Sequence, residues 1–110
     1  MPERIFKAAL IAMAPDADPK KHRCALRTSI YELTSVLVRD EDEAVRISKQ
    51  LVKEDGVRSF LLCPGFTNEG VARVAKATGK GVSVNVARGD GPSNAIAHEI
   101  MEEAGFFDRH

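Results

Sequence analysis

Short apolar runs alternate along the chain with longer stretches in which apolar residues recur at helical spacing. Residues 5–13 are apolar except for Lys7 and contain no glycine or proline, which is typical of a strand covered on both faces. Residues 30–38 are rich in β-branched side chains but include polar ones, so they predict a less buried strand. Residues 57–63 predict a third strand, and the valines that alternate with polar or small residues in 82–87 predict a fourth, at an edge.

Helical spacing follows the second and third of these runs. Asp40 and Glu43 have the spacing of a capping box, and the apolar residues after them predict a helix that continues to Gly56. The apolar positions between 71 and 78 mark one face of another helix, which stops at Gly79.

Two further helices are expected after the first and fourth strands. Asp18 followed by Pro19 has the residue types of an N-cap and a first helical position, so a short helix is expected over residues 18–27. The turn residues 89–92 precede a last helix, expected over 93–104. Its residues expected to be buried are Ile96, Ala97, Ile100 and Met101.

Strands that alternate with helices indicate one α/β domain over residues 1–110, with a small, mainly parallel, four-stranded sheet and helices on both faces. The first and third strands are the most apolar and are expected to be adjacent and central. The expected order is therefore 2-1-3-4, a flavodoxin-like arrangement with a switch point between those two strands. A ligand pocket is expected there, between residues 14–18 and 63–69, with 88–94 on its flank.

Charge and composition exclude several classes of protein. The 110 residues contain 16 Lys plus Arg and 16 Asp plus Glu, and this balance argues against a nucleic-acid partner. No apolar run approaches the roughly 20 residues of a membrane span, and no signal peptide is indicated, so we expect a cytoplasmic protein with no membrane partner. The local basic cluster is interpreted as solvated surface; it consists of Lys20, Lys21, Arg23 and Arg27.

Cysteine chemistry is restricted to two thiols that are expected to be free. Cys24 and Cys63 form no CxxC pair, and Asp16 with Asp18 supplies too few carboxylates for a dedicated site, so no metal site is predicted and no cofactor is indicated. Cys63 follows the third strand beside a helix N-terminus, where a thiol can act as a nucleophile. His22 is the base that it would need, and no spacing brings the two together, so a structural cysteine is the favoured interpretation.

The segment 63–70, Cys-Pro-Gly-Phe-Thr-Asn-Glu-Gly, links the third strand directly to a helix. Gly65 allows a sharp turn, and the free amides of the helix that follows attract an anion. Arg88, after the fourth strand, can add a charge-assisted contact. The alternative is an ordinary strand-to-helix turn. The residues expected to bind a ligand are Gly65, Phe66, Thr67, Asn68, Glu69 and Arg88, with Asp16 from the loop after the first strand.

Two segments carry a resemblance to a known family. They are residues 14–23, Ala-Pro-Asp-Ala-Asp-Pro-Lys-Lys-His-Arg, and residues 63–73, Cys-Pro-Gly-Phe-Thr-Asn-Glu-Gly-Val-Ala-Arg. With them the chain resembles, over nearly its whole length, a group of short bacterial and archaeal proteins classed as a domain of unknown function. The resemblance implies a compact α/β fold and carries over no reaction, cofactor or catalytic residue.

Two classes of function remain open, and they are compatible. The first is the binding of a small anionic molecule at the carboxyl edge of the sheet, with or without catalysis. The second is a non-catalytic module that assembles into a homo-oligomer. The apolar pair Phe106 and Phe107 favours the second class, as does a net charge that offers little repulsion between copies.

Overall fold

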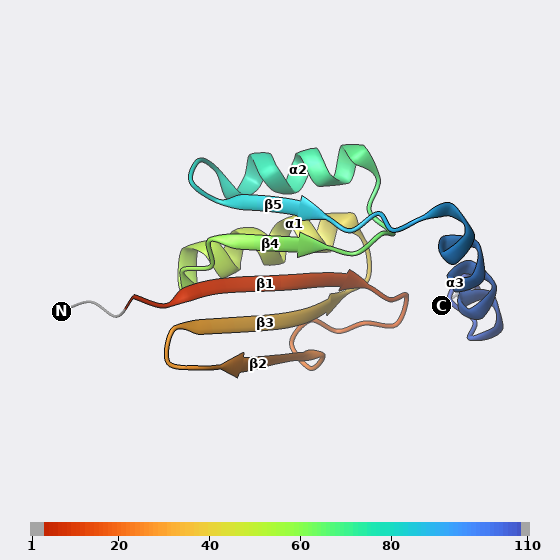
Figure 1. Cartoon of the computed structure of the whole chain (residues 1–110), viewed down its shortest axis with the longest axis horizontal. Helices are drawn as coiled ribbons and strands as arrows, with labels where there is room; N and C mark the ends of the chain where they lie inside the picture. The colour runs from red at the N-terminus through yellow and green to blue at the C-terminus, as the bar shows by residue number, and fades with distance from the viewer. Residues whose placement is uncertain (1–3, 109–110) are drawn as a thin grey trace.

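A computed structural model of the chain describes residues 4–108, which form a five-stranded mixed sheet and three α-helices (Figure 1). The α/β class is therefore confirmed. The strands lie in the order β2-β3-β1-β4-β5. Their bounds are β1 Phe6–Met13, β2 Arg23–Arg27, β3 Tyr31–Val38, β4 Ser59–Leu62 and β5 Ser83–Val86.

β1 is the middle strand of the sheet. It pairs in parallel with β3 on one side and with β4 on the other, and β5 adds a further parallel strand beyond β4. β5 ends the sheet on that side, which agrees with the edge position that its alternating pattern predicted. All four parallel strands therefore point their carboxyl ends to the same end of the molecule (Figure 1).

The prediction of a helix over residues 18–27 is wrong. The chain makes one turn and then forms β2, which runs antiparallel to β3. Thr28 closes this hairpin: its amide donates to the carbonyl of Tyr31 at 2.8 Å, and its hydroxyl accepts from the amides of Ile30 and Tyr31. Pairing is favoured because β3 would otherwise present an unpaired edge. The expected four-stranded, flavodoxin-like sheet is thus replaced by a mixed sheet of five strands.

α1 (Glu41–Gln50) begins at the capping pair that the sequence predicted. Asp40 accepts a hydrogen bond from the amide of Glu43 at 2.8 Å, and the Glu43 carboxylate accepts one from the amide of Arg39 at 2.8 Å. The helix continues as one turn of π-helix (η1, Leu51–Asp55). It ends at Gly56, whose φ of 74° lies in the left-handed region that glycine tolerates.

α1 and α2 (Asn68–Thr78) pack side by side on one face of the sheet, and the core lies between them and that face (Figure 1). Right-handed crossovers explain this arrangement. The connections β3 to β4 and β4 to β5 run in the same direction across the sheet, so both helices fall on the same side. The core side chains include Ala9, Ile11, Val36, Val38, Phe60 and Leu62 from the strands, and Ala44, Ile47 and Val74 from the helices.

The expectation of helices on both faces is wrong, because the segment that would have covered the second face forms β2 instead. We call this uncovered surface the open face. The strand register places five large apolar side chains on it, each between 36% and 70% exposed. They are Phe6, Leu26, Tyr31, Leu37 and Leu61.

α3 (Gly91–Glu103) lies beyond the carboxyl ends of the strands rather than on a sheet face (Figure 1). It begins two residues earlier than expected, with Asp90 accepting from the amide of Ser93 at 2.8 Å. The expected burial of its apolar positions is wrong because no second layer covers a helix in this place. Ile96 is 60% and Ile100 58% exposed, Ala97 is exposed and Met101 is half-buried.

Candidate functional site

Two cavities lie at the carboxyl end of the sheet, where the sequence predicted a pocket. The basic pocket has a volume of about 400 Å³ and lies between α1 and the turn that follows β1. The apolar pocket, of about 650 Å³, lies between the ends of β1 and β4 and the C-terminal segment that contains α3. Arg39, the first residue after β3, lines both cavities.

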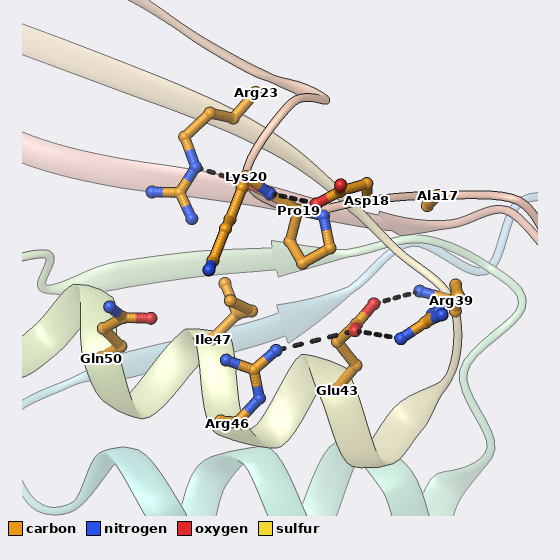
Figure 2. Close-up of a pocket in the computed structure, with 10 residues that line it drawn as sticks. All are labelled: Ala17, Asp18, Pro19, Lys20, Arg23, Arg39, Glu43, Arg46, Ile47 and Gln50. Carbon is orange, nitrogen blue, oxygen red and sulfur yellow. Dashed lines mark hydrogen bonds and ion pairs between the residues drawn. The ribbon is translucent and has the colours of Figure 1, made fainter.

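The basic pocket is lined by side chains from two stretches of the chain, residues 17–23 and 39–50 (Figure 2). The turn over residues 17–20 forms one wall, α1 forms the opposite wall, and Arg23 at the start of β2 borders them. Ile47, which is buried, supplies an apolar surface between these walls. Four cationic side chains and two carboxylates line the cavity: Lys20, Arg23, Arg39 and Arg46, with Asp18 and Glu43.

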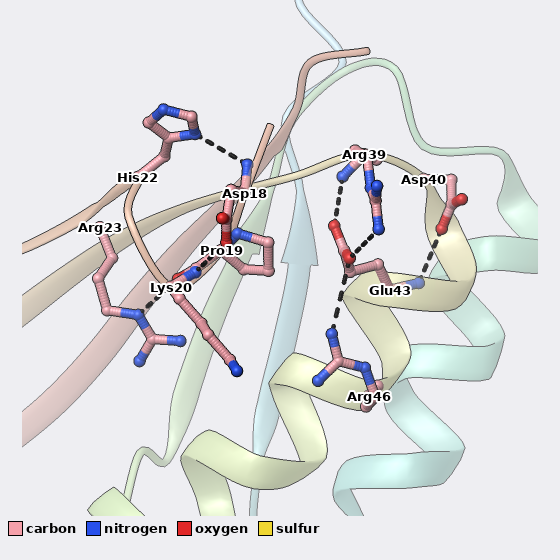
Figure 3. Close-up of polar contacts among 9 residues, drawn as sticks. All are labelled: Asp18, Pro19, Lys20, His22, Arg23, Arg39, Asp40, Glu43 and Arg46. Carbon is pink, nitrogen blue, oxygen red and sulfur yellow. Dashed lines mark hydrogen bonds and ion pairs between the residues drawn. The ribbon is translucent and has the colours of Figure 1, made fainter. Parts of the chain in front are cut away.

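Glu43 pairs with both arginines on the α1 side of the basic pocket (Figure 3). Its carboxylate lies 3.2 Å from a guanidinium nitrogen of Arg39 and 3.6 Å from one of Arg46. The Glu43 side chain is 9% exposed, whereas each arginine side chain is 61% exposed. One carboxylate therefore serves two guanidinium groups, and a positive charge remains on this wall.

The opposite wall is a tight turn that starts at Asp18. The Asp18 carboxylate accepts from the amide of Lys20 at 2.9 Å, and this hydrogen bond is the main reason that the pKa of Asp18 is below its ordinary value of 3.8. The amide of Asp18 donates to Nδ1 of His22 at 2.8 Å, and Nε of Arg23 donates to the carbonyl of Pro19 at 2.8 Å. These bonds fix the positions from which Lys20 and Arg23 project.

The charge on this second wall is also incompletely balanced. Neither Lys20 nor Arg23 forms an ion pair with any residue between 4 and 108. The Asp18 carboxylate is engaged with the backbone of Lys20 rather than with its ammonium group. Both walls of the basic pocket thus present positive charge to the space between them, an arrangement that attracts an anion.

The apolar pocket has a different lining. Met13 and Pro15 come from the end of β1 and the loop after it, and Met101 and Phe106 come from the C-terminal segment. Such a cavity, apolar with a few polar groups, is typical of small-molecule sites. Its polar lining residues are Arg39, Cys63, Asn94 and His98.

Cys63 and His98 line the apolar pocket together, whereas His22, the base considered from the sequence, lies at the turn beside Asp18. The His98 imidazole is 3.0 Å from the Glu102 carboxylate and stacks on the ring of Phe107, with centroids 4.6 Å apart. No hydrogen bond joins the Cys63 thiol to an imidazole in the described part of the chain. The two side chains therefore share one cavity wall, and a catalytic role for Cys63 stays a prediction.

The N-terminus of α2, where an anion was expected, is occupied by a carboxylate of the chain itself. Thr67 is the N-cap, and its hydroxyl accepts from the amide of Gly70 at 2.9 Å. Glu41, at the start of α1, accepts from the amide of Thr67 at 2.7 Å and from its hydroxyl at 3.0 and 3.1 Å. The acidic group that this helix terminus attracts is Glu41, which joins α1 to α2.

Arg88 also bonds to the protein itself. Its guanidinium group donates to the carbonyl of Phe66 at 2.7 Å, to the carbonyl of Pro64 at 3.3 Å and to Oδ1 of Asn68 at 2.8 Å. These bonds hold the loop between β4 and α2 in place. An incoming anion would have to compete with these contacts for the same donors.

The remaining residues expected to bind a ligand are divided among three places. Phe66 is 1% exposed and belongs to the core. Gly65 lines the apolar pocket beside Cys63. Asp16 and Glu69 are exposed and line neither cavity. A binding role for these residues stays a prediction.

Among the residues that line the basic pocket, only Ala17 and Asp18 lie in a segment, 14–18, that the sequence places beside a ligand pocket. The available signal was Arg39, because it directly follows a strand and therefore lies at the carboxyl edge. Lys20 and Arg23 were interpreted as solvated surface, and Glu43 as a helix cap. Their meeting depends on the turn and hairpin that replace the expected first helix.

In residues 4–108, no group of three or more His, Cys, Asp or Glu side chains is placed to hold a metal ion. No helix in this part of the chain has the length and apolar character needed to cross a membrane.

Comparison with known proteins adds a family. A model of a family of unknown function, DUF6506, matches residues 6–102. This match agrees with the resemblance to a domain of unknown function that residues 14–23 and 63–73 carry. No curated protein and no solved structure matches the chain.

Proposed function

This chain belongs to the DUF6506 family, whose function is unknown, and we propose that it binds a small anionic molecule at the carboxyl edge of its sheet, with the anionic group in the basic pocket. The observation that carries the proposal is the charge of that pocket. Lys20 and Arg23 project into it without ion pairs to residues 4–108, and Glu43 is shared between two arginines. A phosphate or carboxylate is the group that such donors bind best.

Binding is measured by calorimetry and thermal shift with inorganic phosphate, sulfate and acetate at constant ionic strength. We expect phosphate to raise the unfolding temperature beyond the effect of chloride, because bound ligand stabilises the folded state by mass action. Lys20→Gln should weaken phosphate binding by about tenfold, which is the loss of one charge-assisted hydrogen bond of about 1.5 kcal/mol.

The matched control is Lys76→Gln, which removes the same charge from an exposed position on α2 outside both cavities. It should leave phosphate binding unchanged. Equal weakening by Lys20→Gln and Lys76→Gln would show that only net charge matters, and would refute the pocket. Weakening by Arg88→Ala alone would instead place the anion at residues 63–69.

We also propose a second function, assembly into a homo-oligomer through the open face. The register pairs Phe6 with Tyr31, whose rings stack with centroids 5.3 Å apart, and pairs Leu10 with Leu61 on the same side. No strand residue on this face is charged. A face without charges meets its own copy without repulsion and offers no charge pattern for a different partner to read.

The size of the open face is consistent with such an interface. Its five large apolar side chains expose on the order of 400 Å² per copy, about half of what each partner buries in a standard interface. The residues between them, such as Leu10 and Leu33, are half-buried and extend the same surface. Phe106 and Phe107, the pair that favoured an oligomer from the sequence, instead line the apolar pocket.

The test is the molar mass by light scattering at high micromolar concentration. We expect twice the chain mass of 12.0 kDa for the wild type and 12.0 kDa for Leu61→Lys, which puts a charge into the open face. The control Ile100→Lys places the same charge on exposed α3 and should leave the mass unchanged. A wild-type mass of 12.0 kDa would exclude this assembly.

A further inference from the structure

We infer that the ligand is an amphipathic anion, with its anionic group beside Arg39 and an aromatic or aliphatic body in the apolar pocket. This inference rests on the proposed function of the basic pocket and deepens it by naming the class of ligand. The two cavities are neighbours along one stretch of backbone: Ala14 and Pro15 line the apolar pocket, and Ala17 and Asp18 line the basic pocket.

Arg39 is the side chain that both cavities share. Its guanidinium group carries five N–H donors. One of its nitrogens donates to the carboxylate of Glu43 at 3.2 Å. Because 61% of the Arg39 side chain is exposed, donors remain for a ligand that enters from the basic pocket. An anionic group held there can place its attached body in the apolar pocket.

The apolar pocket has the size and surface for that body. Its volume of about 650 Å³ lies within the usual range for small-molecule sites. Met13 and Met101 lie among its walls, and methionine side chains adapt to the shape of what they contact. Asn94 and His98 add hydrogen-bonding groups that can fix an orientation.

Ligand binding can be detected at α3, because this helix forms one wall of the apolar pocket and none of its residues is buried. Ala97 is exposed, and Met101 and Phe106 are only half-buried. A ligand body in the cavity would cover these three side chains. Binding should therefore slow hydrogen exchange in α3, which an anion confined to the basic pocket would not do.

The experiment compares two probes, inorganic phosphate and 1-naphthyl phosphate, by calorimetry and by hydrogen exchange. We expect the naphthyl ester to bind about tenfold more tightly or better, because its rings are removed from water. We also expect it, and not inorganic phosphate, to protect residues 91–103. Equal affinity of the two probes, or unchanged exchange in α3, would overturn the inference and leave anion binding intact.

Ala97→Phe fills the apolar pocket, and Ala95→Phe makes the same change on α3 outside both cavities. Ala97→Phe should abolish the extra affinity for the naphthyl ester and retain the binding of phosphate, which also shows that the variant is folded. Ala95→Phe should bind both probes as the wild type does. Loss of the extra affinity in Leu61→Lys instead would place the rings on the open face and overturn the inference.

Failure of the proposed function has a different signature. If wild-type protein binds no inorganic phosphate, or binds it independently of Lys20, the basic pocket is not an anion site. Naphthyl ester binding that needs Ala97 but neither Lys20 nor Arg39 would show an apolar site that does not recognise the anion, and this too would overturn the inference.

Discussion

Glu41 shows how a single side chain changes what a helix terminus can do. The amide and hydroxyl of Thr67, the N-cap of α2, bond to its carboxylate, and the Thr67 hydroxyl accepts from the amide of Gly70. A Cβ atom added at Gly70 would meet that same carboxylate. Glycine at this helical position is therefore explained by the close approach of Glu41.

Gly70 and Glu41 should be energetically coupled. In a helix, Gly→Ala normally stabilises by about 1 kcal/mol. In the wild type we expect Gly70→Ala to give little or none of this stabilisation, because the new methyl group displaces Glu41. In a Glu41→Ala background we expect the full stabilisation. Urea unfolding of the four variants measures the coupling.

The control for this cycle is Gly70→Ala combined with Glu69→Ala, which removes an exposed carboxylate from the same first turn of α2. It should show no recovery of stability. Additive effects of Gly70→Ala and Glu41→Ala would contradict the contact between these two residues.

At the level of elements, β2 is the segment in which local pattern and final structure disagree. Asp18 and Pro19 do start a turn, and the amides of Lys21 and His22 donate to the carbonyl of Asp18 at 3.0 and 2.7 Å. The turn does not continue into a helix because Arg23–Arg27 can complete a ladder with β3. Thr28 and Ser29, just before β3, were the available turn signal, because serine and threonine hydroxyls bond to nearby backbone amides.

A disulfide between β2 and β3 should form if the register is correct. Ala25 lies opposite Thr34 in the ladder. The amide of Leu37 donates to the carbonyl of His22 and that of Thr28 to the carbonyl of Tyr31, so Ala25 and Thr34 are a non-hydrogen-bonded pair. The Cα atoms of such a pair lie closer together, which suits a disulfide. We expect Ala25→Cys with Thr34→Cys to oxidise quantitatively, in a background without the two native cysteines. Non-reducing mass analysis measures this.

The matched pair is Ala25→Cys with Ser35→Cys, whose side chains point to opposite faces of the sheet. It should remain reduced under the same conditions. Equal oxidation of both pairs would contradict the register, and a helical segment would bring neither pair together.

At the level of the whole molecule, the shape is elongated because α3 projects from the end of the sheet (Figure 1). The extents are 50 × 26 × 25 Å, and the radius of gyration is 14.7 Å. A compact domain of this length is expected near 13 Å, or about 10% less. The sheet with α1 and α2 therefore forms one packed body, to which α3 adds the wall of a pocket rather than part of the core.

Removal of α3 should consequently lower the free energy of unfolding by less than one core mutation does. We expect a chain that ends at Gly89 to unfold cooperatively in urea with a loss of about 1–2 kcal/mol, from partly buried side chains such as Met101. Leu51→Ala, at a side chain 1% exposed, should cost about 2–5 kcal/mol. A truncated chain without a cooperative transition would show that α3 belongs to the core.

Local signals in the sequence determined where most elements begin and end. The helix caps act through hydrogen bonds or backbone angles within a few residues of themselves, so the ends of the helices can be predicted without knowing the fold. These caps are Asp40 with Glu43, Thr67, Gly56 and Gly79. The alternation of strands and helices likewise predicted an α/β sheet with functional groups at its carboxyl edge.

Only the tertiary structure decided what each surface meets. Whether residues 23–27 form a helix or a strand depends on the open edge of β3, and this choice leaves one sheet face bare. It also places Lys20 and Arg23 opposite Arg39 and Arg46, and Glu41 bonds to Thr67 at the helix terminus where the sequence predicted a ligand. These outcomes depend on contacts between residues far apart in the chain, and local spacing carries no information about such contacts.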